Sequence, residues 1–364
     1  MKFGIITHYD VHNHGALLQL YALKKVLSQL NIEAYALQFD KNYDFLGVEL
    51  KSKYNISIKS IAYYLGYLKE QGINKTSFNI KKKHILEKFK QDNHLIGEYY
   101  TTEKDLDAIV IGSDEVFALH TGPTPIFFGH ARPCNFAFSY AGSFGPTNLK
   151  DIEDTHCVPF VASGLRSLNG ISVRDINSAR IVEKLTGNNP TIVCDPVILY
   201  GYQNELEHFY PVKLPPYLLV YAYDKNMNDT SEIIEIKKFA KKNKLKIASV
   251  GFYHKWCDYN INIDPINLLH YFANAQYVIT DTFHGSVMSI ITNKQTAVIT
   301  RNNNNKLYNL LQEYNLTDRI MNNEFNFNEV FSHKIDYNMV NKEIEIRRNT
   351  SMNFLNNMIN QIKQ

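Results

Sequence analysis

One segment of the chain places a histidine where a ligand would meet a parallel β-sheet. Residues 277–286 (YVITDTFHGS) predict an apolar strand with a polar end, and 287–291 predict a buried helix. At such strand ends, the next helix presents unpaired N–H groups to anions. His284 adds a group that gives or takes a proton near neutral pH. The segment therefore predicts an anion site with His284 as its acid–base catalyst; the alternative is a hydrogen-bonded, buried histidine beside a capped helix.

Other predicted strand ends carry glycines and polar side chains. Strands at 3–7, 106–111 and 136–140 run into 10–15 (DVHNHG), 112–115 (GSDE) and 141–145 (AGSFG). A helix at 16–30 and a strand at 34–39 complete a βαβ unit with the first strand. Because the carboxyl ends of parallel strands meet at one edge of a sheet, we expect these segments to form a common site. The sequence therefore predicts an α/β protein.

Two arginines are candidates for binding an anionic ligand. Arg174 follows a short predicted strand, 170–173, and a guanidinium matches a phosphate or carboxylate through two parallel hydrogen bonds. Its alternative role is a salt bridge at the surface or between domains. Arg301 and Lys306 flank a run of asparagines that could close over an anion, although such loops are usually only solvated.

Carboxylates are the candidates for removing a proton from a ligand. Asp114 and Glu115 lie at the end of a predicted strand, from which a carboxylate can reach a ligand bound at the edge of the sheet. Asp114 equally fits a helix cap. Asp281 lies three residues before His284 and either orients it or caps its helix, and we expect capping.

Small residues in the turns offer further hydrogen-bond donors to an anion. These anion-binding candidates are Asn13, Gly15, Ser143, Gly285 and Ser286. Glycines in tight turns also occur for their dihedral angles alone, which is the competing explanation.

The length of 364 residues favours two domains. The polar, proline-bearing segment 200–216 is the expected linker, so we place an N-terminal domain at 1–205 and a C-terminal domain at 206–335. Residues 336–364 predict a helix that could pack back on the first domain. We expect Arg174 and His284 to face a cleft between 1–200 and 217–330.

Composition excludes several classes of protein. A net charge of +3, without interleaved aromatic motifs, does not predict nucleic-acid binding. The four cysteines have no metal-ligand spacing and suit a reducing compartment, and we expect no metal. The first predicted strand starts at residue 3 and no apolar run matches a membrane span, so we expect a cytoplasmic protein.

The segment 51–92 interleaves lysines with tyrosines. A helical insertion with a solvated basic face is the expectation for most charge runs. The competing interpretation is peripheral contact with anionic lipid at the inner face of the cytoplasmic membrane, because basic amphipathic helices bind such surfaces.

Taken together, these segments resemble the polysaccharide pyruvyl transferase family. The matching regions, in order, are NHGALLQ (13–19) together with YAL (21–23), then GSDEVF (112–117), SYAGSFG (139–145), ISVRD (171–175), Asp195-Pro196 and TDTFHG (280–285). Each motif alone is weak, but six such regions in the correct order make a fairly specific signal. Their order and spacing agree with the family from about residue 3 to residue 320.

The resemblance implies two Rossmann-like domains facing each other across a cleft, as in GT-B glycosyltransferases. It also implies transfer of the carbon skeleton of phosphoenolpyruvate onto two hydroxyls of a sugar, which makes a pyruvate ketal. The acceptor would be a glycan or lipid-linked sugar in a cell-surface polysaccharide precursor, and no cofactor beyond this co-substrate is expected.

The chain departs from the family pattern at three positions. Glu115 and Phe117 stand where the family usually has Gln and Trp, and His14 replaces a common aromatic residue. These changes bear on acceptor choice more than on donor chemistry. Two alternatives stay open: a glycosyltransferase that uses a nucleotide sugar, and a non-catalytic glycan-binding or assembly protein.

Overall fold

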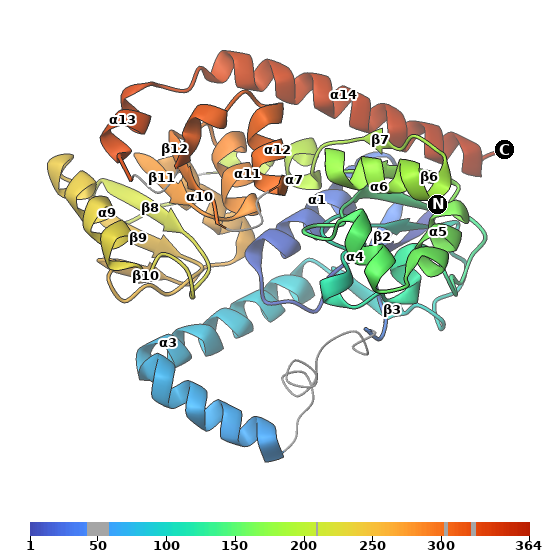
Figure 1. Ribbon diagram of the computed structural model, residues 1–364, viewed down its shortest axis with the longest axis horizontal. Coiled ribbons are helices and arrows are strands. Elements are labelled where there is room, and N and C mark those ends of the chain that lie inside the picture. Colours follow the sequence, from blue (N-terminus) through green and yellow to red (C-terminus); the bar gives the residue numbers. More distant parts are fainter. Residues whose placement is uncertain (42–57, 209, 302–304, 322–324) are drawn as a thin grey trace.

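The computed structural model describes residues 1–41, 58–208, 210–301, 305–321 and 325–364, and for 58–71 and 305 only the backbone. This part of the chain forms two parallel β-sheets flanked by helices, which stand side by side in Figure 1. The predicted α/β class is therefore confirmed.

The first sheet has seven strands among the described residues, and all its neighbouring strands are parallel. In spatial order they are β3 (Ile96–Tyr99), β2 (Glu33–Gln38), β1 (Lys2–Ile6), β4 (Ala108–Ile111), β5 (Ala137–Gly142), β6 (Gly170–Val173) and β7 (Thr191–Ile192). The order of the strands along the sheet changes direction between β1 and β4. Strand β1 lies between β2 and β4, and its Phe3 pairs with Ala34 of β2 and with Ala108 of β4.

The second sheet repeats this order with six strands in the described part of the chain, again all parallel. The strands are β10 (Tyr259–Ile261), β9 (Lys246–Val250), β8 (Tyr217–Tyr221), β11 (Tyr277–Thr280), β12 (Thr296–Ile299) and β13 (Ile320–Met321). Here the reversal lies between β8 and β11. Both β4 and β8 are buried along their whole length, as expected for parallel strands covered by helices on both faces.

Helices cover both sheets. Those that come before the second sheet are α1 (His14–Gln29), α3 (Ile58–Asp92), α4 (Leu149–Asp154), α5 (Val158–Arg166), α6 (Ile176–Thr186), α7 (Pro196–Tyr200) and α8 (Gln203–Glu207), with short 3₁₀ turns η2 (Leu119–Thr121) and η3 (Pro125–Phe128). The later ones are α9 (Thr230–Lys242), α10 (Pro265–Asn274), α11 (Phe283–Ile291), α12 (Asn305–Glu313), η4 (Thr317–Arg319), α13 (Phe327–Ser332) and α14 (Tyr337–Ile362).

Two long helices connect the units. In Figure 1, α14 runs along the top of both, and its two ends contact different units: Tyr337 Oη donates to Lys294 O, and Phe354 packs edge-on against Phe138. Helix α3, which bends at Gly72, reaches the second unit through Phe78 O, which accepts from Asn262 Nδ2 at 2.7 Å.

The interior is also shared between the two units. One apolar core continues from the first unit into the second and includes the fully buried Leu18, Ile198 and Leu355. The facing position of the two sheets is therefore fixed by a common core as well as by the two long helices.

Several element boundaries differ from the sequence expectation. The strands β3, β10 and β13 were not predicted, because they are short edge strands of two to four residues with little apolar pattern. The expected linker at 200–216 contains α8.

Part of the basic segment 51–92 lies outside the described residues, and the rest belongs to the bent helix α3. In the described part of the chain, every helix is too short or too polar to cross a membrane.

Candidate active site

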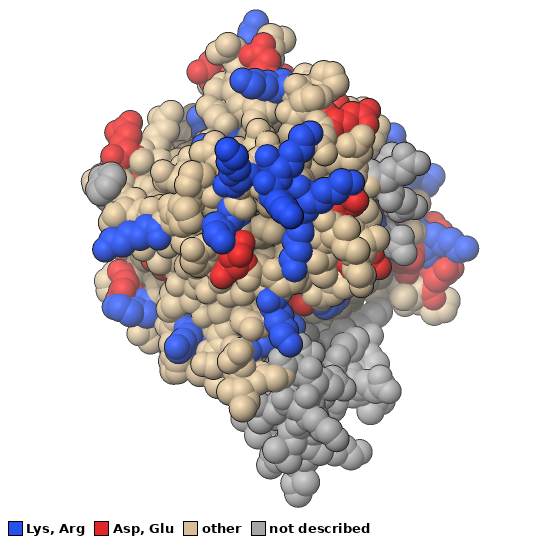
Figure 2. Space-filling view, turned by 90° about the vertical axis from the view of Figure 1, so that its left-hand side faces the viewer, with Lys and Arg blue, Asp and Glu red and all other residues tan. Residues whose placement is uncertain are grey.

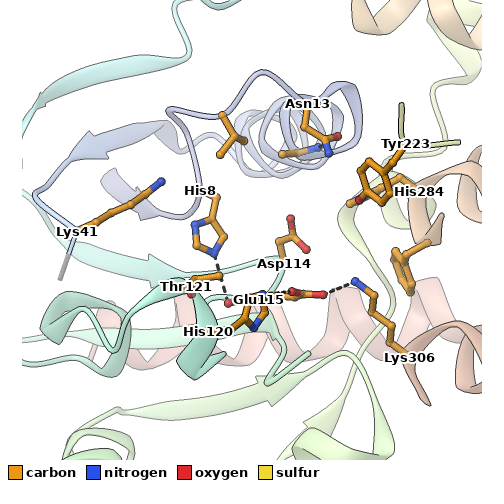
Figure 3. Close-up of a pocket in the computed structure, with 13 residues that line it drawn as sticks. His8, Asn13, Lys41, Asp114, Glu115, His120, Thr121, Tyr223, His284 and Lys306 are labelled. Atoms are coloured by element: carbon orange, nitrogen blue, oxygen red, sulfur yellow. Dashed lines mark hydrogen bonds and ion pairs between the residues drawn. The ribbon is translucent and has the colours of Figure 1, made fainter. Parts of the chain in front are cut away.

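The carboxyl ends of the two sheets meet at the points where their strand orders reverse. Such reversal points are where open α/β sheets bind ligands. A cavity of about 400 Å³ lies there, lined from both units (Figure 3). Its lining residues are His8, Val11, Asn13, Ala16, Lys41, Asp114, Glu115, His120, Thr121, Tyr223, Phe283, His284 and Lys306.

His284 belongs to the first turn of α11, directly after β11. The side chain of Thr282 caps this helix by accepting the N–H of Gly285 at 2.9 Å. The cap was expected from Asp281, and that expectation is wrong because Asp281 points instead to Arg301, 3.2 Å away. Among the described residues, the N–H groups of Phe283 and His284 keep no partner, so they remain available to an anion at the positive end of the helix.

The imidazole of His284 is held between the two units. Gly15 lies against it so closely that an added Cβ would come within 2.4 Å of Cγ and Nδ1, so only glycine fits there. Nε2 is buried without a hydrogen bond and lies 3.8 Å from Asp195 Oδ2. Burial lowers the pKa of His284 more than the nearby carboxylates of Asp195 and Asp114 raise it. The side chain is therefore neutral at pH 7 in the absence of a ligand.

Arg174 lies beneath the cavity and is not part of its lining. Its guanidinium binds Asp195 Oδ2 at 2.9 Å and Asp114 Oδ1 at 3.4 Å, and it covers the ring of Phe283 at 4.1 Å. The side chain is only 3% exposed. Because Arg174 and His284 contact the same oxygen of Asp195, the structure brings the two predicted residues together, but Arg174 is already paired with carboxylates.

Asp114 points into the cavity from the loop after β4 (Figure 3). Burial raises the pKa of this carboxyl, but the charge of Arg174 outweighs burial and keeps the pKa below its usual range. No α-helix starts at Asp114, so the alternative role of helix cap is wrong. The carboxylate is ionised at neutral pH and can accept a hydrogen bond from a ligand hydroxyl.

Glu115 carries an ion pair across the cavity. Its carboxylate binds Lys306 of α12, in the second unit, and His120 Nε2 at 3.2 Å (Figure 3). Burial raises its pKa, but the hydrogen bond from His120 and the charge of Lys306 together hold it far below the ordinary value. Burial lowers the pKa of Lys306, and the pairing with Glu115 more than restores it. Both groups are therefore charged.

Several lining residues were missed in the sequence. His8 follows β1 directly and its Nε2 lies 3.3 Å from Glu115 O, while Lys41 pairs with Asp10 at 2.5 Å. Tyr223 follows β8 and enters from the second unit. His8, Lys41 and Tyr223 follow strand ends, which is the signal that identified His284. His120 carries no such local signal, because only the tertiary fold brings it to the cavity.

The remaining predicted residues have other partners. Asn13 lines the cavity and caps α1, where Oδ1 accepts the N–H of Gly15 at 2.8 Å. Ser143 Oγ is buried and donates to Asp175 at 2.7 Å. Ser286 Oγ is likewise buried and donates to Thr282 O. Of the predicted set, His284, Asp114, Glu115 and Asn13 line the cavity; Arg174, Gly15, Ser143, Gly285, Ser286 and Arg301 do not.

Arg301 and Asp281 form a separate network. Arg301 pairs with Asp281 and with Glu232, which is 4% exposed. Burial raises the pKa of Asp281, and Arg301 only partly offsets this. As the structure stands, Arg301 ties the end of β12 to α9 and does not reach the cavity.

The first residue of α1 joins the two units next to the site. His14 is fully buried, and its Nε2 lies 2.8 Å from Ile263 O in the second unit. The imidazole packs against Gly251, where φ is +78° and an added Cβ would lie 2.9 Å from Cε1 of His14. Burial, aided by the charge of Lys82, lowers the pKa of His14 to about 3.

The described residues include no group of three or more His, Cys, Asp or Glu that is arranged to hold a metal ion.

The two facing α/β units, with a cavity lined from both, form a GT-B-like fold. The chain belongs to the polysaccharide pyruvyl transferase family, whose model matches residues 13–303. No functionally curated protein matches the sequence significantly.

Solved structures that are similar to this chain include two UDP-GlcNAc 2-epimerases and a glycosyltransferase, all of very low sequence identity. The UDP-N-acetylglucosamine 2-epimerase from Rickettsia bellii matches with a TM-score of 0.53 and 10% identity, covering 100% of this chain and 97% of its own. The UDP-GlcNAc 2-epimerase from Methanocaldococcus jannaschii matches at 0.49 and 12%, covering 96% and 93%. The glycosyltransferase SnogD from Streptomyces nogalater matches at 0.43 and 9%, covering 97% and 95%. At 10% identity, the first of these bears on the fold alone, and it supports the GT-B-like arrangement.

Proposed function

We propose that this protein transfers the pyruvyl group of phosphoenolpyruvate onto two hydroxyls of a sugar in a cell-surface polysaccharide precursor, forming a pyruvate ketal. The observation that carries the proposal is the environment of His284. An imidazole with an unpartnered Nε2 lies beside open N–H groups at a helix N-terminus, in a cavity that also contains an ionised carboxylate. Anion binding, proton donation and proton acceptance are the three tasks that this reaction sets.

The donor would bind at the start of α11. Phosphoenolpyruvate carries a phosphate and a carboxylate, and the N–H groups of Phe283 and His284 suit either one. Lys306 and Lys41 supply cationic side chains on opposite walls of the cavity. Since Lys306 is bound to Glu115, the donor competes with that carboxylate for the ammonium group.

His284 would protonate the methylene carbon of the donor. Burial keeps the imidazole neutral, but a bound dianionic phosphate next to it favours the charged form and raises its pKa. The acid is then formed only when the donor is present. Proton transfer to the methylene carbon leaves a cationic carbon that carries the phosphate ester oxygen.

Asp114 would take the proton of the first attacking hydroxyl. A sugar oxygen bonds to the cationic carbon, the bond to phosphate breaks, and a second hydroxyl replaces the phosphate. The new methyl group takes its proton from His284, Asp114 holds the proton of the first hydroxyl, and the proton of the second hydroxyl leaves with phosphate. Return of a proton from Asp114 to His284 through solvent restores both groups. Because a hydroxyl that attacks a cation loses its proton readily, a carboxylate with a lowered pKa such as Asp114 is basic enough.

Arg174 and Asp195 would position the two reacting side chains. Arg174 contacts Asp114 and Asp195, and Asp195 in turn faces Nε2 of His284. Residues of this kind keep catalytic groups in place through packing and paired charges. The donor-binding role first expected for Arg174 remains a prediction, and donor affinity in Arg174 variants tests it.

Thermal unfolding with phosphoenolpyruvate and with a panel of nucleotide sugars tests the donor. A ligand at a hundred times its Kd adds about 2.7 kcal/mol to the free energy of unfolding. Mass spectrometry after incubation with phosphoenolpyruvate and lipid-linked acceptors should then show the ketal product. Stabilisation by a nucleotide sugar alone would replace the proposal with a glycosyltransferase. Binding of a glycan without any product would replace it with a non-catalytic role.

A further inference from the structure

Lysines gather on one face of the second unit, away from the cavity. Between residues 236 and 257 the chain has seven lysines and no Asp or Glu. All seven are exposed, and six of them lie on the second half of α9, the turn after it and the start of β9. We call them the α9 lysine face: Lys237, Lys238, Lys241, Lys242, Lys244 and Lys246. Figure 2 shows a dense group of basic side chains on the side of the molecule that α9 occupies in Figure 1.

Acidic side chains neutralise little of this charge. Lys238 lies 3.4 Å from Glu235, and Lys246 lies 3.9 Å from Asp258, both at exposed positions. Such exposed pairs are weak. Within the described residues, the other four lysines form no ion pair with a carboxylate. The α9 lysine face therefore keeps a positive potential.

An exposed apolar residue accompanies the lysines. Ile234 is 55% exposed and lies three and four residues before Lys237 and Lys238, so the three share one side of α9. The opposite side of the helix is buried through Ile236 and Phe239. Lysines beside an exposed apolar side chain are the pattern with which helices bind the surface of anionic bilayers.

The same residues argue against nucleic acid as the partner. The face has lysines only, whereas arginine is the residue that recognises phosphates and bases through a planar fork. Phe239 is the sole aromatic residue between 237 and 246, and it is 3% exposed, so no ring is available for stacking on bases.

We propose that the α9 lysine face binds a membrane surface that contains anionic lipid headgroups. Helix α9 starts near the carboxyl ends of the strands, where Tyr223 lines the cavity. It ends near the amino ends of the strands, where the N–H of Lys246 donates to Pro216 O at 3.0 Å. Its thirteen residues span roughly 20 Å. A molecule bound through this face keeps its cleft open. The benefit, access to a lipid-linked acceptor, rests on the proposed function, but the binding does not.

Vesicle flotation tests the proposal with two matched variants. Vesicles of phosphatidylcholine with phosphatidylglycerol are compared with phosphatidylcholine alone at low salt. The first variant carries Lys237→Gln, Lys238→Gln and Lys241→Gln. The second carries Lys81→Gln, Lys83→Gln and Lys88→Gln, exposed lysines of α3 with the same change in net charge. Each lysine near an anionic surface contributes roughly a fivefold factor to binding.

We expect the wild type to float with the anionic vesicles only, the α9 variant to lose about 100-fold in partitioning, and the α3 variant to match the wild type. Equal binding by the α9 variant and the wild type would overturn the proposal. A loss confined to the α3 variant would do so too and would support the segment 51–92 instead. Turnover with phosphoenolpyruvate and a soluble acceptor should be unchanged in both variants, so failure of flotation is separable from failure of the proposed reaction.

Discussion

The two units that line the cavity share a strand order, but their polar groups are paired differently. We call the side formed by the first unit the first wall and the side formed by the second unit the second wall. On the first wall, Asp114 and Glu115 follow β4 and both carboxylates are bound to cations. On the second wall, His284 follows β11 at the corresponding strand of the repeat, and its buried Nε2 has no hydrogen bond. The topology fixes where side chains meet, whereas the pairing differs from one wall to the other.

This difference indicates which wall receives the donor. Leaving a buried polar atom without a partner costs about 1–3 kcal/mol, so such atoms are rare unless a ligand or water completes them. The first wall has its charges satisfied and holds its carboxylates in fixed positions. The second wall keeps an open helix N-terminus and an unpaired imidazole, which an anionic ligand would complete.

The largest effect is expected where the first wall is anchored. Arg174→Ala leaves Asp195 buried without its main partner, which should lower the free energy of unfolding by about 3–5 kcal/mol. Urea denaturation measures this, with Arg180→Ala, an exposed arginine of α6, as the matched control that should stay within about 0.5 kcal/mol of wild type. If Arg174→Ala folds as stably as the control and instead loses donor affinity, Arg174 binds the donor and the anchoring role is wrong.

Removing the acid from the second wall should cost at least about 100-fold in turnover. His284→Gln keeps a hydrogen-bond donor but cannot transfer a proton, so affinity for phosphoenolpyruvate should change little while turnover is lost. Single-turnover kinetics and donor binding measure the two effects, with His156→Gln, an exposed histidine, as the control. Near wild-type turnover in His284→Gln would mean that the histidine only positions the anion.

The contact that holds the two walls together should make stability depend on pH. The pKa of His14 is about 3 in the folded protein and about 6.5 in the unfolded chain. Below pH 6.5, His14 therefore binds a proton in the unfolded chain but not in the folded protein. Its contribution to stability is therefore complete above pH 6.5 and falls by about 2 kcal/mol by pH 5.

Comparison with a His14→Gln variant isolates this contribution, because other buried histidines such as His8 also have a lowered pKa. Unfolding of the variant between pH 7.5 and pH 5 should show a loss smaller by about 2 kcal/mol than in wild type. His84→Gln, at an exposed position on α3, should keep the wild-type dependence. Identical slopes for His14→Gln and wild type would show that His14 does not resist protonation.

The sequence predicted the sheets and the wall that carries His284 because both depend on local patterns. Apolar runs that end in glycine and polar residues identify strand ends, and parallel strands bring their carboxyl ends together. The same rule would have found His8 and Tyr223. It could not distinguish the role of Arg174, since a guanidinium at a strand end looks the same whether carboxylates already bind it or not. The partners Asp114 and Asp195 lie 60 and 21 residues away from Arg174 in the chain.

Lys306 is a second residue whose partner could not be predicted from the sequence. A lysine next to an asparagine run gave only the signal of a solvated loop, yet the fold brings it to Glu115, 191 residues away. Its pairing partner and its position in the cavity are properties of the assembled walls. A test of Lys306 therefore has to separate joining the two walls from binding the donor.

The smallest expected effect is about tenfold in donor affinity for Lys306→Gln, which is about 1.4 kcal/mol and near the lower range for a hydrogen bond to a charged group. The loss is limited because the donor must displace Glu115 before it can use Lys306. Glu115→Gln should leave donor affinity equal to or higher than that of the wild type, because it releases Lys306 from its ion pair. Titration with phosphoenolpyruvate, followed by thermal unfolding, measures both variants against wild type. If the lysine only joins the two walls, both substitutions break the same ion pair, so an equal loss of donor affinity in the two variants would remove Lys306 from the donor site.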